Sequence, residues 1–235
     1  MNFESNIKEF LLNHNLNYKD ISYYVEACTH SSFSNEQRHV SAIIHNERLE
    51  FLGDAILQLC CSKFLFDLIP ILPEGSMTRI RSALVREEAL DKYADQTGLP
   101  KCLRLGRGEE KMGGRRRASL KADAFEAIIG AIYEDLGYTE VQKFLVPILT
   151  LEFEAIKEND ERDFKSRLQE FIQADDKRTI SYDLISSSGP AHAKVFEIAV
   201  KLDEIILGTG SATTKKEAEQ FAAKQALSIL ALNND

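Results

Sequence analysis

Three carboxylates recur at helical spacing within one short stretch of the chain. Glu47, Glu50 and Asp54 are separated by three and then four residues, which places them along one edge of a helix. The apolar residues of this stretch recur at similar steps and predict that helix; they are Leu49, Leu52, Ile56 and Leu59. Like charges on one edge repel one another, and a hard divalent cation would offset that repulsion. For this stretch alone, a solvated acidic edge is an equally good explanation.

A second predicted helix, residues 121–136, carries Asp123 and Glu126 one turn apart. Its apolar surface would pack against the rest of the domain; it comprises Ala124, Phe125, Ile128, Ile129 and Ile132. If the two helices place their carboxylates at one level, four ligand residues come together: Glu50, Asp54, Asp123 and Glu126. Oxygen ligands without a neighbouring His or Cys favour Mg²⁺ or Mn²⁺ over zinc. A di-iron carboxylate site is excluded because it needs Glu-x-x-His pairs, which neither helix has.

Several ordered motifs give the chain a family resemblance. Residues 46–57 closely resemble the signature stretch of the ribonuclease III family of double-stranded-RNA endonucleases, and the match extends to residues 73–81, 106–110 and 121–133. The resemblance implies a divalent-metal-dependent hydrolase that cuts double-stranded RNA and leaves 5′-phosphate and 3′-hydroxyl ends. It also implies processing of ribosomal RNA precursors and of some messenger and transfer transcripts.

The resemblance assigns roles to the carboxylates. We expect Asp54 and Glu126 to be the catalytic metal ligands, with Glu50 and Asp123 completing the cluster. Magnesium is the expected cofactor, with manganese as a substitute, in the manner of two-metal phosphoryl transfer. No histidine or lysine stands out as a general base, which agrees with metal activation of the attacking water.

Three further residues receive supporting roles from the same resemblance. Glu47 would help to bind RNA or to hold a dimer. Glu74 would assist the metal site or the RNA near the cut, although a loop carboxylate paired with an arginine is an alternative. Phe51 resembles the family residue that fills a pocket on a partner subunit, whereas a core position is its alternative. The interface role predicts a C2 homodimer.

Length and composition suit one large or two modest domains. The chain has 235 residues, a net charge of −8 and four cysteines without metal-ligand spacing, which we expect to be buried and reduced. Neither a membrane span nor a secretion signal is evident, so we expect a cytoplasmic protein without a membrane partner. The acidic balance opposes nucleic-acid binding, but residues 115–117 and 215–216 form local basic clusters.

The first predicted domain is all-α and covers residues 1–157. Residues 106–114 are rich in glycine and charge and predict a loop. The basic residues 115–117 that follow it would hold the phosphodiester backbone, with a merely solvated loop as the alternative. His30 has no paired nucleophile and is interpreted as a hydrogen-bonded structural residue. Residues 158–163 lack apolar side chains and predict a short, mobile linker.

The second predicted domain, residues 164–235, has the order α-β-β-β-α. A helix over residues 164–174 is followed by strands over 180–185, 195–202 and 205–211, and Thr214 caps a final helix over 215–232. Leu168, Phe171 and Ile172 would form the apolar face of the first helix, and Ala218, Ala222, Ala226 and Ile229 that of the last.

This domain resembles the double-stranded-RNA-binding domain. By that resemblance, Gln169, Glu170 and His192 would contact 2′-hydroxyls or base edges in two minor grooves, and Lys215 and Lys216 would grip the intervening phosphates. Many such domains carry a third lysine about where this chain has Glu219. That difference predicts weaker binding to phosphate.

Two functions of different classes fit the sequence. The first is a metal-dependent endonuclease, which the presence of all the acidic residues favours. The second is a module that binds double-stranded RNA without cutting it. A cleavage assay with magnesium and with EDTA distinguishes them.

Overall fold

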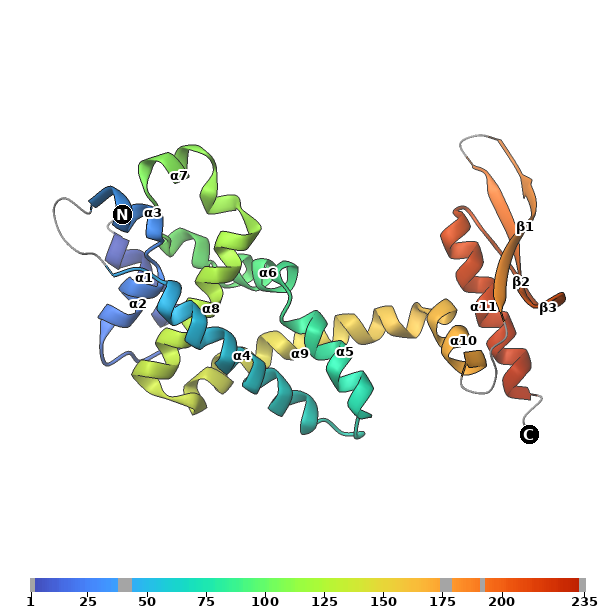
Figure 1. Cartoon of the computed structure of the whole chain (residues 1–235), viewed down its shortest axis with the longest axis horizontal. Helices are drawn as coiled ribbons and strands as arrows, with labels where there is room; N and C mark the ends of the chain where they lie inside the picture. Colours follow the sequence, from blue (N-terminus) through green and yellow to red (C-terminus); the bar gives the residue numbers. More distant parts are fainter. Residues whose placement is uncertain (1–2, 38–43, 174–178, 191–192, 233–235) are drawn as a thin grey trace. The chain divides into compact units, whose positions relative to one another are not determined.

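The computed structural model describes residues 3–37, 44–173, 179–190 and 193–232 (Figure 1). The chain forms two compact units, Met1–Glu154 and Ala155–Asp235. The first unit is helical and the second combines helices with a three-stranded sheet, which confirms the predicted fold class. Among the described helices, none combines the length and apolar character needed to cross a membrane.

The first unit begins with three short helices and is organised around two long ones. Its elements are α1 (Phe3–Asn13), α2 (Ile21–Ala27), α3 (Ser31–Gln37), α4 (Glu47–Phe66), α5 (Glu74–Leu84), α6 (Glu87–Thr97), the 3₁₀ helix η1 (Leu99–Cys102), α7 (Arg107–Lys111), the 3₁₀ helix η2 (Gly114–Arg116), α8 (Ala118–Leu136) and the part of α9 (Tyr138–Arg162) up to Glu154.

Helix α8 forms the centre of the first core. Its apolar residues from Ala124 to Ile132 are almost completely buried, as the sequence predicts. Buried polar groups attach α8 to its neighbours. Lys121 pairs with Asp95 of α6 at 2.7 Å, and Asp135 accepts hydrogen bonds from the Tyr24 hydroxyl and from backbone amides before α2. All four cysteines are free and buried, as predicted.

Helices α4 and α8 pack side by side (Figure 1), and two glycines lie at their contact. A Cβ atom on Gly53 would lie 1.8 Å from the carbonyl oxygen of Glu126, and a Cβ atom on Gly130 would lie 2.3 Å from that of Leu49. Any side chain at either position would therefore push the two backbones apart. Because Gly53 and Gly130 lie within one turn of Glu50 and Glu126, this contact sets the spacing of the acidic residues.

Four local predictions for the first unit were wrong. Residues 106–114 are not simply a loop, because α7 and part of η2 lie within them. Backbone amides of Arg107 and Gly108 donate to the Glu36 carboxylate of α3. These amides at the start of α7 have no acceptor within the helix, so a residue far away in sequence provides one. Leu59 is 54% exposed instead of buried.

The other two wrong predictions concern helix ends. The sequence predicts a helix that is opened by Ser76 or Thr78, after Glu74 and Gly75, whereas α5 begins at Glu74. Helix α9 continues to Arg162, through most of the predicted linker. The charged residues after Glu154 include good helix formers, so a helix already nucleated continues through them.

The second unit contains α10 (Phe164–Gln173), β1 (Ile180–Ser188), β2 (Val195–Leu202), β3 (Ile205–Ala212) and α11 (Lys215–Leu232). The strands form an antiparallel sheet in the order β1-β2-β3, with Tyr182 opposite Val200 and Ile198 opposite Gly210. Strand β1 is longer than predicted, and a register shift between Leu184 and Ser186 lets it continue to Ser188.

Small residues let α11 lie close to the sheet. A Cβ atom on Gly210 of β3 would approach the Ala218 oxygen to 2.3 Å, so β3 and α11 meet through backbone and alanines. Ala218, Ala222 and Ala226 are fully buried, as predicted, and Leu168 of α10 packs into the same core. The predicted core positions Phe171 and Ile229 are instead 44% and 42% exposed. The Thr214 hydroxyl accepts a hydrogen bond from the Glu217 amide and caps α11 as predicted.

Candidate functional site

Three of the predicted metal ligands converge between α4 and α8. Glu50, Asp123 and Glu126 each offer a carboxylate oxygen, and these atoms all lie within 4.8 Å of one another. Each side chain is partly buried. Two helices that cross at glycines thus bring together acids that are far apart in sequence. The spacing and the oxygen-only donor set fit a hard divalent cation.

The electrostatics of this cluster reflect concentrated negative charge. Burial, followed by the charges of Asp54, Glu50 and Asp123, raises the pKa of Glu126 to about 8. Burial and then Asp123 and Glu47 also raise the pKa of Glu50. Repulsion of this kind is what a cation would relieve.

Asp54 lies on the same helix but outside the group of three. Its side chain is exposed, and its Oδ1 accepts a hydrogen bond from Gln58 at 3.4 Å. Asp54 nevertheless contributes the largest charge effect on the pKa of Glu126. Its carboxylate is therefore close enough to influence the site electrostatically.

Glu47 and Glu74 also stand outside the group of three. Glu47 begins α4, has a 61% exposed side chain and lies 3.8 Å from the His45 imidazole. Glu74 begins α5, and its Oε1 accepts a hydrogen bond from the Thr78 hydroxyl at 2.9 Å. Thr78 lies one turn further along the same helix.

Two groups influence the pKa of Asp123 in a way that the sequence interpretation did not predict. After burial, the charge of Glu87, at the start of α6, raises the pKa of Asp123, and His30 opposes that rise. His30 is hydrogen-bonded as predicted, because its Nδ1 accepts from the Ser32 amide and lies 2.8 Å from the Ser32 hydroxyl. Sequence spacing could not predict either effect on the pKa of Asp123, because Glu87 and His30 lie on or next to helices other than α8.

The basic residues after α7 are partly engaged by acids. The Arg117 guanidinium lies 2.9 Å from Glu109, and Arg115 makes two hydrogen bonds to Glu110. Arg115 also donates to the backbone carbonyls of Pro100 and Leu103. Arg115 therefore has a structural role, because its hydrogen bonds connect α7 with η1 and with the residue that follows η1.

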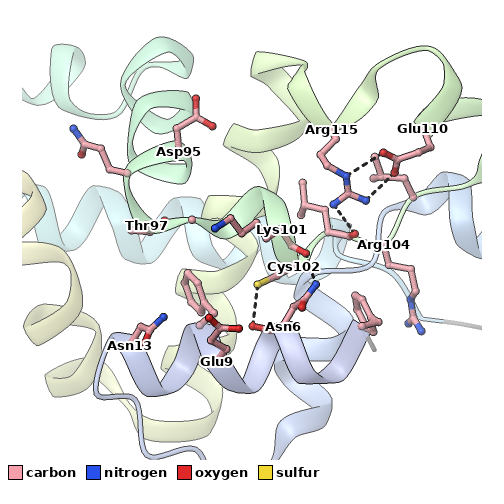
Figure 2. A pocket seen from close by; sticks show the side chains of 16 residues that line it. Asn6, Glu9, Asn13, Asp95, Thr97, Lys101, Cys102, Arg104, Glu110 and Arg115 are labelled. Atoms are coloured by element: carbon pink, nitrogen blue, oxygen red, sulfur yellow. Dashed lines mark hydrogen bonds and ion pairs between the residues drawn. The ribbon is translucent and has the colours of Figure 1, made fainter. Parts of the chain in front are cut away.

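A large hollow in the first unit is separate from the carboxylate cluster. It lies among α1, α6, η1 and α7, and Figure 2 shows Arg115, Glu110, Asn6 and Cys102 on its walls. No carboxylate of the cluster lines it, although Arg115, from the predicted backbone-binding residues 115–117, does. Its polar groups largely bond one another, as in the hydrogen bond from Asn6 to the Lys101 carbonyl. We therefore place the chemistry at the cluster and not in this hollow.

Phe51 belongs to an exposed apolar face of α4. Its side chain is 83% exposed, and Leu59 and Phe66 of the same helix are 54% and 71% exposed. Ile69 and Ile71, which follow α4, are 92% and 86% exposed. Phe51 is therefore not a core residue of the isolated chain. Exposed apolar surface of this extent is typical of an interface.

The described RNA-binding candidates are all exposed. Gln169 and Glu170 lie on α10, whereas Lys215 and Lys216 open α11. His192 lies outside the described residues. The sequence interpretation missed Lys194, whose Nζ lies 5.6 Å from the Phe196 ring centre, while Lys215 approaches the same ring at 5.9 Å. Its position directly before the predicted strand 195–202 is the signal that could have found it.

Comparison with known proteins follows the division into two units. Residues 20–151 match a family model described as Ribonuclease-III-like, and residues 164–230 match one described as a double-stranded RNA binding motif. A protein named Ribonuclease 3 from Streptococcus gordonii is 44% identical over 209 residues, covering 89% of this chain and 90% of that protein. One of the same name from Shouchella clausii is 45% identical over 228 residues, covering 96% and 85%.

A solved structure is similar to the first unit. The nuclease domain of ribonuclease III from Campylobacter jejuni is 32% identical, with a TM-score of 0.57, and the match covers 63% of this chain and 99% of that domain. Its description refers to a region involved in dimer formation of that domain.

Proposed function

This chain belongs to the ribonuclease III family of double-stranded-RNA endoribonucleases, and we propose that the acids between α4 and α8 form its active site. The ligands would be Glu50, Asp54, Asp123 and Glu126. The observation that carries this proposal is the convergence of three of these carboxylates within 4.8 Å. Members of this family depend on a divalent metal, and we propose Mg²⁺, with Mn²⁺ as a substitute, because all donors are hard oxygen atoms.

Each carboxylate has a defined task in this proposal. Burial and three neighbouring acids raise the pKa of Glu126 to about 8. Glu126 must lose its proton to become a ligand. Asp54, exposed at the edge, would reach towards the scissile phosphate together with Glu126, and Glu50 and Asp123 would complete the ligand set. When bound, a divalent cation supplies a Lewis acid that lowers the pKa of water and offsets phosphate charge.

Glu47 and Glu74 would support this site without joining the ligand set. Glu47 begins α4, one turn before Glu50, and Glu74 begins α5, which packs against α4. Both side chains are exposed. The products would carry 5′-phosphate and 3′-hydroxyl ends. We further propose that the protein acts in the cytoplasm on precursors of ribosomal RNA and on some messenger and transfer transcripts.

The second unit would supply most of the affinity for the RNA duplex. We propose that residues 1–157 form the nuclease domain and residues 164–235 the RNA-binding domain, joined by residues 158–163, most of which belong to the end of α9. Gln169 and Glu170 would contact the minor groove, with His192 at the next one, and Lys215 and Lys216 would contact phosphates. The exposure of the described candidates supports this assignment.

The active-site proposal is tested by replacing Glu126. We expect Glu126→Gln to reduce cleavage of a long RNA duplex in Mg²⁺ by at least about 1,000-fold, since a metal ligand is lost. Binding of the duplex should be retained. Glu134→Gln is the matched control, because it makes the same change at an exposed position of the same helix.

The outcomes separate the two candidate functions. Cleavage by the wild-type chain that stops in EDTA supports the nuclease. Binding without cleavage in Mg²⁺ or Mn²⁺ would identify a non-cutting binding module. Full cleavage by Glu126→Gln would remove Glu126 from the mechanism.

We also propose that the chain forms a C2 homodimer through the exposed apolar face of α4. A cavity of about 260 Å³ between α4 and α5 is lined by Leu65, Phe66 and Met77 and also by four polar or charged residues, Ser62, Glu74, Thr78 and Arg81. Phe51 of a second copy could fill this cavity, and a two-fold axis would repeat the contact.

The dimer proposal is tested by adding charge to that face. We expect Phe51→Asp to raise the dimer dissociation constant by at least about 100-fold, because a carboxylate would enter an apolar contact. Sedimentation equilibrium measures this change. Leu12→Asp, at a 77% exposed position on α1, is the control and should leave the constant unchanged. A wild-type monomer at micromolar concentration would contradict the proposal.

A further inference from the structure

An ion pair joins the two helices of the second unit. Lys165 Nζ of α10 lies 2.6 Å from Glu219 Oε2 of α11, and the two side chains are 34% and 26% exposed. Both charges are thus partly shielded from water, yet both remain accessible from outside. An ion pair in this setting is less strongly screened than one on an open surface.

Other contacts fix Lys165 in this position. Its backbone amide donates to Gln220 of α11 at 3.1 Å, and its Nζ lies 4.4 Å from the centre of the Tyr182 ring of β1. Gln220 in turn donates to Asp163 at 2.9 Å. Lys165 is therefore held from α11 and from β1, and its ammonium group faces Glu219.

The ion pair lies beside residues assigned to RNA binding. Lys165 is one helical turn before Gln169 on α10, and Glu219 is one turn after Lys215 on α11. The ion pair therefore lies next to the candidate minor-groove residues of α10 and the candidate phosphate-binding residues of α11. The cations of Lys194 and Lys215 lie over the Phe196 ring, whereas the cation of Lys165 already has a carboxylate partner.

We propose that Glu219 is an internal counter-anion that keeps Lys165 from binding an RNA phosphate and so sets the affinity of this unit for duplex RNA. The proposal rests on the proposed RNA-binding function of the second unit. A phosphate oxygen that approached Lys165 would have to displace the Glu219 carboxylate, and it would meet the repulsion of that carboxylate. Neutralising Glu219 frees one cation for the duplex.

The salt dependence of binding reports the number of phosphates contacted. Each contact releases condensed counterions, so one additional contact steepens the slope of log K against log salt by about one unit. We expect Glu219→Gln to produce this steeper slope and to tighten duplex binding about threefold to tenfold near physiological salt. Lys165→Gln alone should leave the slope unchanged, because Lys165 contacts no phosphate while Glu219 is present.

The experiment uses the full chain in EDTA with a blunt RNA duplex, so that binding proceeds without cleavage. Dissociation constants are measured from low to physiological salt for the wild type, Glu219→Gln, Lys165→Gln and the double variant. Glu204→Gln is the charge-matched control at an exposed turn between β2 and β3. Thermal melting by circular dichroism verifies that each variant is folded.

The double variant decides whether Lys165 is the cation that is freed. Its slope should return to the wild-type value. An unchanged slope in Glu219→Gln, a gain that survives in the double variant, or an equal gain in Glu204→Gln would each overturn the proposal. A shallower slope in Lys165→Gln would also overturn it, because Lys165 would then already contact phosphate. Failure of the wild-type chain to bind the duplex would instead contradict the proposed RNA-binding function.

Discussion

Glu126 is the residue on which the charges of the cluster act most strongly. Its carboxylate is partly buried, and Asp54, Glu50 and Asp123 all disfavour its ionisation. Asp123 and Glu50 also have raised pKa values, chiefly through burial. The fold thus maintains a group of acids that repel one another, at a cost in stability that a bound cation can offset.

This cost has a definite pH dependence. The pKa of Glu126 is about 8 in the fold against an ordinary value of 4.5. Between these values the folded chain keeps a proton that the unfolded chain has lost, so stability decreases as pH rises through this window. We expect the melting temperature of the wild type in EDTA to fall from pH 5 to pH 8 relative to that of Glu126→Gln.

Differential scanning calorimetry at several pH values measures this difference. Adding Mg²⁺ at pH 8 should raise the melting temperature of the wild type more than that of Glu126→Gln. Glu134→Gln should follow the wild type at every pH. Parallel pH profiles for the wild type and Glu126→Gln would show that Glu126 does not carry the repulsion.

At the residue scale, sequence spacing predicted the three acids that converge, but not which acid lies at the exposed edge of the cluster. Residues at three- and four-residue steps on two apolar helices were enough to select Glu50, Asp123 and Glu126. The spacing could not show that Asp54 lies at the exposed edge, because that depends on where α4 crosses α8. Nor could it find Glu87 and His30, which act on Asp123 from other parts of the chain.

At the scale of elements, the contact between α4 and α8 determines the geometry of the site. A methyl group at Gly53 would lie 1.8 Å from a backbone oxygen of Glu126, and backbone atoms cannot rotate away as a side chain can. We expect Gly53→Ala to destabilise the chain by about 3 kcal/mol, towards the upper end of overpacking effects. It should also lower the affinity for Mn²⁺, because α4 would move away from α8.

Denaturant unfolding measures the stability, and titration calorimetry measures metal binding. Gly75→Ala is the control, because a Cβ atom at that helical position meets nothing within 4 Å. It should change the free energy of unfolding by less than about 1 kcal/mol. Normal stability of Gly53→Ala would mean that the two helices are not held by this close approach.

The wrong predictions at this scale share a physical cause. Helix α4 has two apolar faces, and periodicity alone cannot tell which one packs on α8; Leu59 belongs to the exposed face together with Phe51. Helix α7 forms in a glycine-rich segment because Glu36, far away in the sequence, accepts from its first amides. Local patterns record propensity, whereas both features depend on tertiary partners.

At the scale of the whole molecule, the two units divide the work of cutting and holding RNA. The first contains the carboxylate cluster, and the Campylobacter jejuni structure that it resembles is a nuclease domain alone. The second carries Lys194, Lys215 and Lys216 near one helix end. The strongly acidic net charge of −8 does not prevent RNA binding, because the basic residues are locally concentrated.

Removing the second unit should therefore separate affinity from chemistry. We expect a chain that ends at Asp163 to bind duplex RNA at least about tenfold more weakly near physiological salt, since several phosphate contacts are lost. It should still cut at low salt, where the remaining electrostatic attraction is stronger, and Mg²⁺ dependence should be unchanged. Filter binding and cleavage assays across a salt series measure both effects, with full-length Glu126→Gln as the variant that holds RNA without cutting it. If the shortened chain bound as tightly as the full chain at every salt concentration, the residues that determine RNA affinity would have to lie in the first unit.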